Sequence, residues 1–293
     1  MSSMRGIALN SEPRTDPAHV SLAPTLRADA RWGSLLAELF GLDASAEELA
    51  VVSGRRQEGR SLAGDDYFQL SASEGALDLR PPGQHSRPGI RATFPPDRGG
   101  AGRNPLVRAF GKRTLRIFDL TAGLGGDAYR LARAGHDVRA AERDSAVYAL
   151  LASGWRAACE AGSVPETIAK RLEFTHQDGD ALLSSIEGLD QGVYIDPMYP
   201  PPKRASAKPR RELQVLRALL GGQTDAAALV EGARPYAARV VVKRPHHAEA
   251  LVPGASFEVE TKLVRFDVYV NPEKMSPATT LTSASSSTEV ETA

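Results

Sequence analysis

The sequence predicts an α/β fold with a mostly parallel sheet that ends in an antiparallel hairpin. From residue 105 onward, short apolar strand patterns alternate with helical patterns, which is typical of βαβ units. The last two strand patterns are separated by only a few residues, too few for a crossover connection. We expect strands at 115–120, 137–142, 171–176, 191–196, 239–243, 256–262 and 265–270, and helices near 127–134, 145–160 and 209–220.

Three further segments surround this main domain, which we place at residues 105–272. Residues 1–28 lack the apolar core of a signal peptide and predict a disordered leader. Residues 29–104 predict a small, β-rich N-terminal region that ends in a basic loop rich in Pro and Gly. It contains a helix-like stretch at 32–40 and strand-like pieces at 49–52, 67–70 and 76–79. The Ser- and Thr-rich residues 273–293 predict a disordered tail.

Composition narrows the class of protein. The chain has 293 residues, 42% of them hydrophobic, which is ample for a core. A single cysteine, Cys159, excludes an internal disulfide framework and fits a reducing cytosol, so we expect a cytoplasmic protein. No apolar run reaches the ~18 residues of a membrane span. Six histidines without metal-ligand spacing predict no metal site.

A glycine-rich turn follows the strand at 115–120. The turn holds Gly123, Gly125 and Gly126, and a helical pattern begins at Asp127. Glycines at a strand-to-helix turn let the backbone approach a ligand closely. The next strand ends in Glu142, 17 positions after Gly125, which suits a carboxylate that accepts from two ribose hydroxyls. Together these features predict a cofactor that contains adenosine. Asp119, at the end of the first strand, either contacts this cofactor or organises the turn.

A second motif follows the strand at 191–196. Pro197 cannot extend a sheet, so the strand stops at Asp196, and Tyr199 lies just beyond. A carboxylate and an aromatic ring are thereby left at the carboxyl edge of the sheet, where open α/β sheets bind ligands. Such a pair suits a planar base with an exocyclic amine. A simple strand-ending turn is the structural alternative.

Two cofactors contain adenosine and could use this turn. Residues 123–128 also satisfy the G-x-G-x-x-A fingerprint of nicotinamide dinucleotides. That interpretation leaves the acid and aromatic ring at 196–199 unexplained. S-adenosylmethionine accounts for both motifs, with the glycine turn on the cofactor side and residues 196–199 on the acceptor side.

Basic residues gather near these motifs although the net charge is zero, with 36 basic and 36 acidic residues. Such residues can hold phosphates without reading a base sequence. The alternative is a set of solvated or structural charges at strand ends. The candidates for RNA contact are Lys203, Arg204, Lys208, Arg210, Arg211, Lys243 and Arg244.

The ordered motifs resemble the RsmJ family, the ribosomal RNA small subunit methyltransferases J. The resemblance covers roughly 105–270 and is carried by residues 119–127, 142–143, 196–200, 240–245 and 265–269. It implies a class I S-adenosylmethionine-dependent methyltransferase fold with a Rossmann-like sheet. It also implies methylation of the exocyclic N2 of a guanine in 16S rRNA of the small ribosomal subunit.

The resemblance also implies roles for individual residues. Asp127, Glu142 and Arg143 would contact the cofactor, and Asp196 would lie where cofactor and acceptor meet. We expect the Asp196 carboxylate and the Pro197 carbonyl to accept from the acceptor amine, and Tyr199 to stack on the base. The sequence departs from the family at Gly126, commonly Arg, and at Asp178-Gly179, commonly Ser-Ser. Asp178 could accept from the adenine amino group.

Two other functions stay open alongside a nicotinamide oxidoreductase. One is an amino-group methyltransferase of the adenine-N6 type on another nucleic acid, which the motif at 196–199 also fits. The other is a module of the same fold that binds rRNA without turnover. Binding of S-adenosylmethionine distinguishes the last of these from an enzyme.

Overall fold

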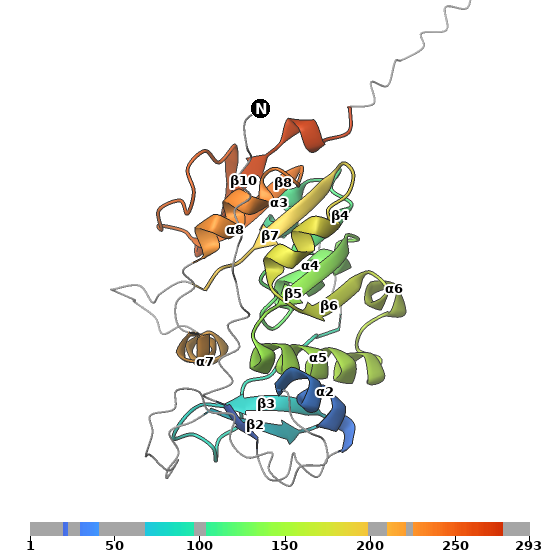
Figure 1. Cartoon of the computed structure of the whole chain (residues 1–293), viewed down its shortest axis with the longest axis vertical. Coiled ribbons are helices and arrows are strands. Elements are labelled where there is room, and N and C mark those ends of the chain that lie inside the picture. The colour runs from blue at the N-terminus through green and yellow to red at the C-terminus, as the bar shows by residue number, and fades with distance from the viewer. Residues whose placement is uncertain are drawn as a thin grey trace, which may run out of the picture.

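Seven strands form the main sheet in the order β6-β5-β4-β7-β8-β10-β9 (Figure 1). The computed structural model describes residues 20–22, 30–40, 68–96, 104–198, 210–220 and 225–277. The strands of this sheet are β4 (Arg116–Asp119), β5 (Asp137–Glu142), β6 (Leu172–His176), β7 (Gln191–Ile195), β8 (Arg239–Pro245), β9 (Phe257–Glu260) and β10 (Val264–Val270).

The first five strands of this order are parallel, and β10 is antiparallel to both β8 and β9. The predicted sheet with its terminal hairpin is therefore confirmed. From β4 the chain builds outward through β5 and β6, then returns to place β7 on the other side of β4. The order of the strands thus reverses between β4 and β7. Ligands of open α/β sheets bind at the carboxyl edge of such a switch point.

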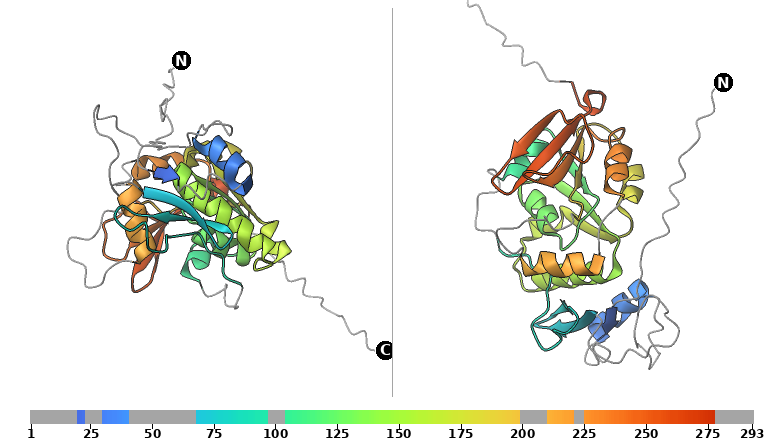
Figure 2. Two further views of the ribbon diagram at one scale, coloured as in Figure 1. Left: turned by 90° about the horizontal axis from the view of Figure 1, so that it is seen from below. Right: turned by 90° about the vertical axis from the view of Figure 1, so that its left-hand side faces the viewer.

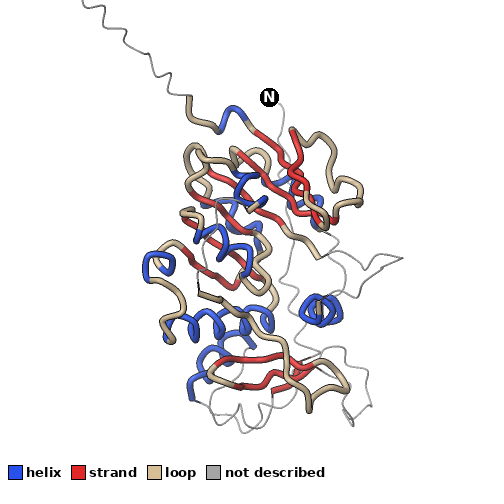
Figure 3. The backbone as a smooth tube through the Cα atoms, turned by 180° about the vertical axis from the view of Figure 1, so that it is seen from behind, coloured by secondary structure: helices blue, strands red, loops and turns tan. Residues whose placement is uncertain are grey.

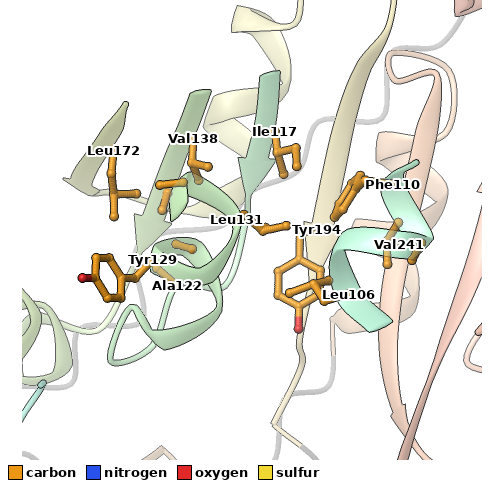
Figure 4. Packing of buried hydrophobic residues seen from close by; sticks show 14 of the residues in the cluster. Leu106, Phe110, Ile117, Ala122, Tyr129, Leu131, Val138, Leu172, Tyr194 and Val241 are labelled. Atoms are coloured by element: carbon orange, nitrogen blue, oxygen red, sulfur yellow. The ribbon is translucent and has the colours of Figure 1, made fainter. Parts of the chain in front are cut away.

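Helices cover both faces because side chains alternate along each buried strand. Tyr194 faces α3 (Pro105–Phe110) and α4 (Gly126–Arg133), whereas Val193 faces the opposite layer. Figure 4 shows Leu106 and Phe110 of α3 beside Tyr194 and Val241. The opposite layer contains the 3-10 helix η3 (Gly179–Ser185) and α8 (Ala226–Ala233). A short helix, α6 (Glu166–Ala169), precedes β6.

A smaller sheet packs on the side of α5 (Ser145–Glu160) that faces away from the main sheet (Figure 2). It consists of β1 (Val20–Leu22), β2 (Phe68–Ser73) and β3 (Ala76–Arg80), and α2 (Ala30–Phe40) lies beside it. The Leu77 N–H donates to Ser153 Oγ of α5 at 3.1 Å. Leu150 of α5 packs into this second core, while Leu151 packs into the core of the main domain. Figure 3 shows α5 between the two sheets.

Helix α7 (Arg211–Leu220) closes the second core with Val215 and Leu216. The last described element is the 3-10 helix η4 (Pro272–Lys274). No helix in the described part of the chain has the length and apolar character needed to span a bilayer. The described residues likewise contain no cluster of three or more His, Cys, Asp or Glu arranged to hold a metal ion.

The structure moves three of the predicted segment limits. Strand β1 lies within the leader that we expected to be disordered, where it pairs with β2. The main core begins well before residue 105, since Ala92 and Phe94 are buried in it. Gly154 of α5 permits this approach, because a Cβ there would lie 2.4 Å from the Ala92 carbonyl oxygen. Structure also continues into the expected tail, where the Ser276 N–H donates to Asp190. The strand expected at 49–52 lies outside the described residues.

Candidate functional site

Three acids meet where adjacent parallel strands end. Asp119 closes β4, Glu142 closes β5, and Asp196 directly follows β7. These strands are neighbours in the sheet, so their carboxyl ends share one edge. The candidate site therefore lies at the carboxyl edge of the sheet, next to the switch point between β4 and β7.

The glycine turn between β4 and α4 is packed on one side and open on the other. Gly125 has φ +78, and a Cβ there would lie 2.5 Å from Leu151 Cδ1 and 3.0 Å from Phe174. Gly123 has φ +55, but its Cβ would meet nothing closer than the Thr121 carbonyl oxygen at 4.0 Å. Gly126 starts α4 and is also uncrowded. The turn thus presents backbone to open space, which fits a ligand that approaches the main chain closely.

Glu142 connects the glycine turn to α5. Its Oε2 accepts from the Gly123 N–H and its Oε1 from the Asp144 N–H, both at 2.8 Å. Burial raises the pKa of this carboxyl to about 7, despite the two hydrogen bonds that favour the ionised form. A carboxylate has about four lone-pair positions, so each oxygen keeps one for a further donor. Two ribose hydroxyls are donors of the required kind.

Asp119 shapes the turn. Its Oδ1 accepts from the Thr121 N–H at 3.0 Å, and the side chain is fully buried. Burial raises the pKa of Asp119 well above its usual range. These contacts favour the organising role over direct contact with a cofactor.

A polar network joins the glycine-turn helix to the residue after β7. Asp127, in the first turn of α4, accepts through Oδ2 from the Tyr194 hydroxyl at 2.7 Å and from Lys243 Nζ at 2.8 Å. Lys243 Nζ also donates to Asp196 Oδ2 at 2.8 Å. The Asp196 N–H donates to Thr121 Oγ1 at 2.7 Å. The main chain and the carboxylate of Asp196 are therefore both held from neighbouring elements.

The exposure of these carboxylates separates their roles. Asp119 is 1% exposed, but the Asp196 side chain keeps 32% of its surface accessible, so Asp196 is the more accessible of these two acids. Burial raises the pKa of Asp196, and Lys243 opposes this rise. Burial would also raise the pKa of Asp127, but Lys243, Arg130 and the Tyr194 hydroxyl together lower it. The two carboxylates in turn raise the pKa of Lys243 against the effect of its burial.

Arg143, Asp178 and Gly179 lie on the other side of Glu142. Arg143 donates to Asp225 at 2.6 Å, and its guanidinium lies 3.9 Å from Asp178 Oδ1. Asp225 is the residue before α8, so Arg143 connects the end of β5 to that helix. Gly179 has a steric role, because a Cβ there would lie 2.2 Å from the Leu120 carbonyl oxygen. A serine at this position would require the main chain to move.

Two of the predicted RNA contacts have partners within the protein. Arg244 is buried, and its Nε donates to the Glu249 carbonyl at 3.0 Å, so it organises the loop after β8. Lys243, whose side chain is partly exposed, donates to Asp127 and Asp196 in the polar network described above. Arg210 and Arg211 lie exposed at the start of α7, where the Arg211 guanidinium donates to the Pro88 carbonyl. Pro197 is buried beside Asp196. The predicted residues Tyr199, Lys203, Arg204 and Lys208 lie outside the described part of the chain.

The sequence interpretation missed several residues of the site. Thr121 and Tyr194 hold Asp196 and Asp127, Asp225 pairs with Arg143, and Phe94 packs over the glycine turn. Strand alternation could have identified Tyr194, which lies two positions before Asp196 and so faces the same side of the sheet. The others depend on contacts between segments far apart in the sequence, and no local pattern indicates them.

The fold, the open glycine turn and the acids at the switch point define a class I S-adenosylmethionine-dependent methyltransferase. The family model described as putative SAM-dependent methyltransferase matches residues 84–271. A solved SAM-dependent methyltransferase from Neisseria gonorrhoeae has a TM-score of 0.56 and 27% identity to this chain. The match covers 86% of this chain and 95% of that one.

Curated relatives narrow the class. A ribosomal RNA small subunit methyltransferase J from Yersinia enterocolitica is 41% identical over 177 residues, which are 59% of this chain and 70% of the relative. A protein of the same name from Aliivibrio fischeri is 40% identical over 229 residues, or 71% of this chain and 87% of the relative. The chain therefore belongs to the ribosomal RNA small subunit methyltransferase J family. Its cofactor is S-adenosylmethionine, and the nicotinamide alternative is wrong.

Proposed function

We propose that this methyltransferase modifies the exocyclic N2 of a guanine in 16S rRNA of the small ribosomal subunit. The observation that carries the proposal is Asp196, a partly exposed carboxylate held beside the open glycine turn. Relatives that are 40–41% identical to this chain bear the name ribosomal RNA small subunit methyltransferase J, which supports the choice of substrate. The guanine N2 assignment comes from the resemblance of the motifs and from the acceptor chemistry of the site.

The cofactor side of the site fits S-adenosylmethionine. The open backbone at Gly123 admits close approach, and Glu142 retains acceptor positions for both ribose hydroxyls. We infer that Asp178, at the N-cap of η3, accepts from an adenine amino group. When bound, the cofactor supplies a methyl group that is already electrophilic. The protein must then hold the acceptor nitrogen in line with the methyl carbon and the sulfur. This alignment can lower the activation barrier by roughly 7–11 kcal/mol at most.

The acceptor side requires hydrogen-bond acceptors for an amine. A guanine N2 is a weak nucleophile because its lone pair is delocalised into the ring. We infer that the Asp196 carboxylate and the Pro197 carbonyl accept from its two N–H groups and draw the nitrogen toward tetrahedral geometry. The same oxygens stabilise the positive charge that develops on the nitrogen. The proton of the methylated nitrogen then leaves readily to water, so a dedicated base is unnecessary.

The base must leave its own stack before it reaches this edge. Stacking of Tyr199 on the flipped base stays a prediction, as do phosphate contacts by Lys203, Arg204 and Lys208. Arg210 and Arg211 are exposed at the start of α7, which supports their assignment to the RNA backbone.

The test is transfer of labelled methyl groups to small subunits that lack the endogenous modification, followed by digestion to nucleosides. We expect label in N2-methylguanosine with the wild type and almost none with Asp196→Asn, which retains shape but loses an acceptor. Label in N6-methyladenosine would show that the acceptor is adenine rather than guanine. Absence of label in spite of cofactor binding would overturn the proposed substrate. Thermal unfolding of Asp196→Asn checks that the fold is intact.

A further inference from the structure

Lys243 is built into the acceptor side of the site by strand register. Tyr194 of β7 pairs with Val241 of β8, so Asp196 and Lys243, each two positions further on, come side by side. Both face the layer of α4, because alternation keeps them on the side of Tyr194 and Val241. The ammonium lies 2.8 Å from Asp196 Oδ2 and 2.8 Å from Asp127 Oδ2. The backbone thus dictates this contact.

The surroundings of Asp196 are unusually acidic. Burial raises the pKa of Asp196, and Asp127 on α4 repels its negative charge and raises that pKa further. Arg130 forms an ion pair with Asp127, and the Tyr194 hydroxyl donates its hydrogen bond to Asp127 rather than to Asp196. Among the described residues, Lys243 is the cation that contacts both Asp127 and Asp196.

We propose that Lys243 is the positioning residue of the acceptor site, which holds Asp196 Oδ2 so that Oδ1 is directed at the acceptor amine. This inference rests on the proposed transfer to an amino group. Lys243 acts through Asp196 and does not itself touch the acceptor. It also ties the acceptor carboxylate to α4, the helix that begins at the glycine turn, so both substrates are placed by one network.

Loss of the ammonium has a chemical consequence for Asp196. Without Lys243, burial and repulsion from Asp127 would raise the pKa of Asp196 unopposed. In a protonated carboxyl one oxygen becomes an O–H donor. That oxygen can no longer accept a hydrogen bond from the N–H of the amine. Turnover should therefore fall at neutral pH and recover as the pH is raised.

The experiment compares Lys243→Met, Lys243→Arg and Lys262→Met, the last an exposed lysine that follows β9. Methyl transfer to undermodified small subunits is measured across the neutral pH range. We expect Lys243→Met to lower kcat at neutral pH at least about tenfold, which is the loss of ionised carboxylate where the pH lies about one unit below the raised pKa. Its KM for the subunit should be unchanged, and the acid limb of its kcat profile should move to higher pH. Lys243→Arg should keep the wild-type limb, and Lys262→Met should match the wild type throughout.

A second measurement separates this inference from the proposed substrate. Carboxyl 13C NMR follows Asp196, assigned by loss of its signal in Asp196→Asn, and requires no RNA. We expect the signal to titrate at higher pH in Lys243→Met than in the wild type. Superposed titrations, or a loss confined to KM, would overturn the role of Lys243 even if the wild type is active. A shifted titration in a protein that methylates no guanine would overturn only the proposed substrate.

Discussion

At the residue scale, Gly125 combines a left-handed backbone conformation with close packing. Its φ of +78 lies in the left-handed region, and a Cβ would press against Leu151. Glycine is the residue that meets both conditions. The glycine turn thus depends on the core of the domain for its shape, and the open backbone at Gly123 follows from that anchoring.

We predict that Gly125→Ala destabilises the fold by about 2–4 kcal/mol, because strain at positive φ and overpacking add. It should also weaken binding of S-adenosylmethionine at least about tenfold, equivalent to 1.4 kcal/mol. Gly162→Ala is the matched control, since Gly162 has φ +66 with nothing within 4 Å of a Cβ. Chemical denaturation and calorimetric titration give the two quantities. Equal effects of the two substitutions would contradict the crowding argument.

Glu142 gives the cofactor site a pH dependence. Its pKa of about 7 means that much of the wild type carries a protonated Glu142 just below neutrality. That proton must be lost before both oxygens can accept hydroxyls as well as the N–H groups of Gly123 and Asp144. We therefore predict that the affinity for S-adenosylmethionine rises as the pH increases through about 7 and then levels off. In Glu142→Gln it should be weaker and flat over this range, as calorimetry at a series of pH values would show.

The same pKa has a consequence for stability, with its sign set by proton uptake. Between the ordinary pKa of a glutamate and about 7, the folded chain binds more protons at Glu142 than the unfolded chain. The contribution of this group to stability therefore falls as the pH rises through that window. The stability of Glu142→Gln relative to the wild type should rise over the same window. A difference that is constant with pH would show that Glu142 is ionised throughout.

At the scale of elements, the strands were the predictable part of the fold. Apolar runs such as 193–195 lie in a sheet buried on both faces, so their sequence signal is strong. Helices α3 and α8 were missed because they have only six and eight residues, and the many alanines of α8 give little contrast between its faces. Strand β1 gives no signal, since its three residues become a strand only by pairing with β2. The inward turn of Lys243 likewise depends on register, which composition does not reveal.

Helix α5 supplies side chains to both cores, so we expect the two sheets to fold as one unit. Leu77 on β3 is fully buried against it. We predict that Leu77→Ala destabilises the whole chain by about 2–5 kcal/mol, with the two cores unfolding in a single transition. Leu263→Ala, at a side chain that is 82% exposed, should change stability by less than about 0.5 kcal/mol. Two separate transitions in Leu77→Ala would show that the N-terminal region folds independently.

At the scale of the whole molecule, a net charge of zero means that attraction to RNA must come from the distribution of charge. Arg210 lies at the start of α7, which follows the acceptor motif in the chain. Arg116, equally exposed, begins β4 and so lies at the amino edge of the sheet, away from the site. The two arginines therefore separate a local effect from one of total charge.

We predict that Arg210→Gln raises the KM for the small subunit by about 2–5-fold without a change in cofactor affinity. The logarithmic dependence of binding on salt should become shallower by about 0.7–0.9, the contribution of one phosphate contact. Arg116→Gln removes the same charge and should leave both quantities near the wild-type values. Filter binding of labelled rRNA over a series of salt concentrations measures the slope. Equal slopes for the two variants would indicate that net charge, rather than the position of Arg210 at the start of α7, governs attraction to the RNA.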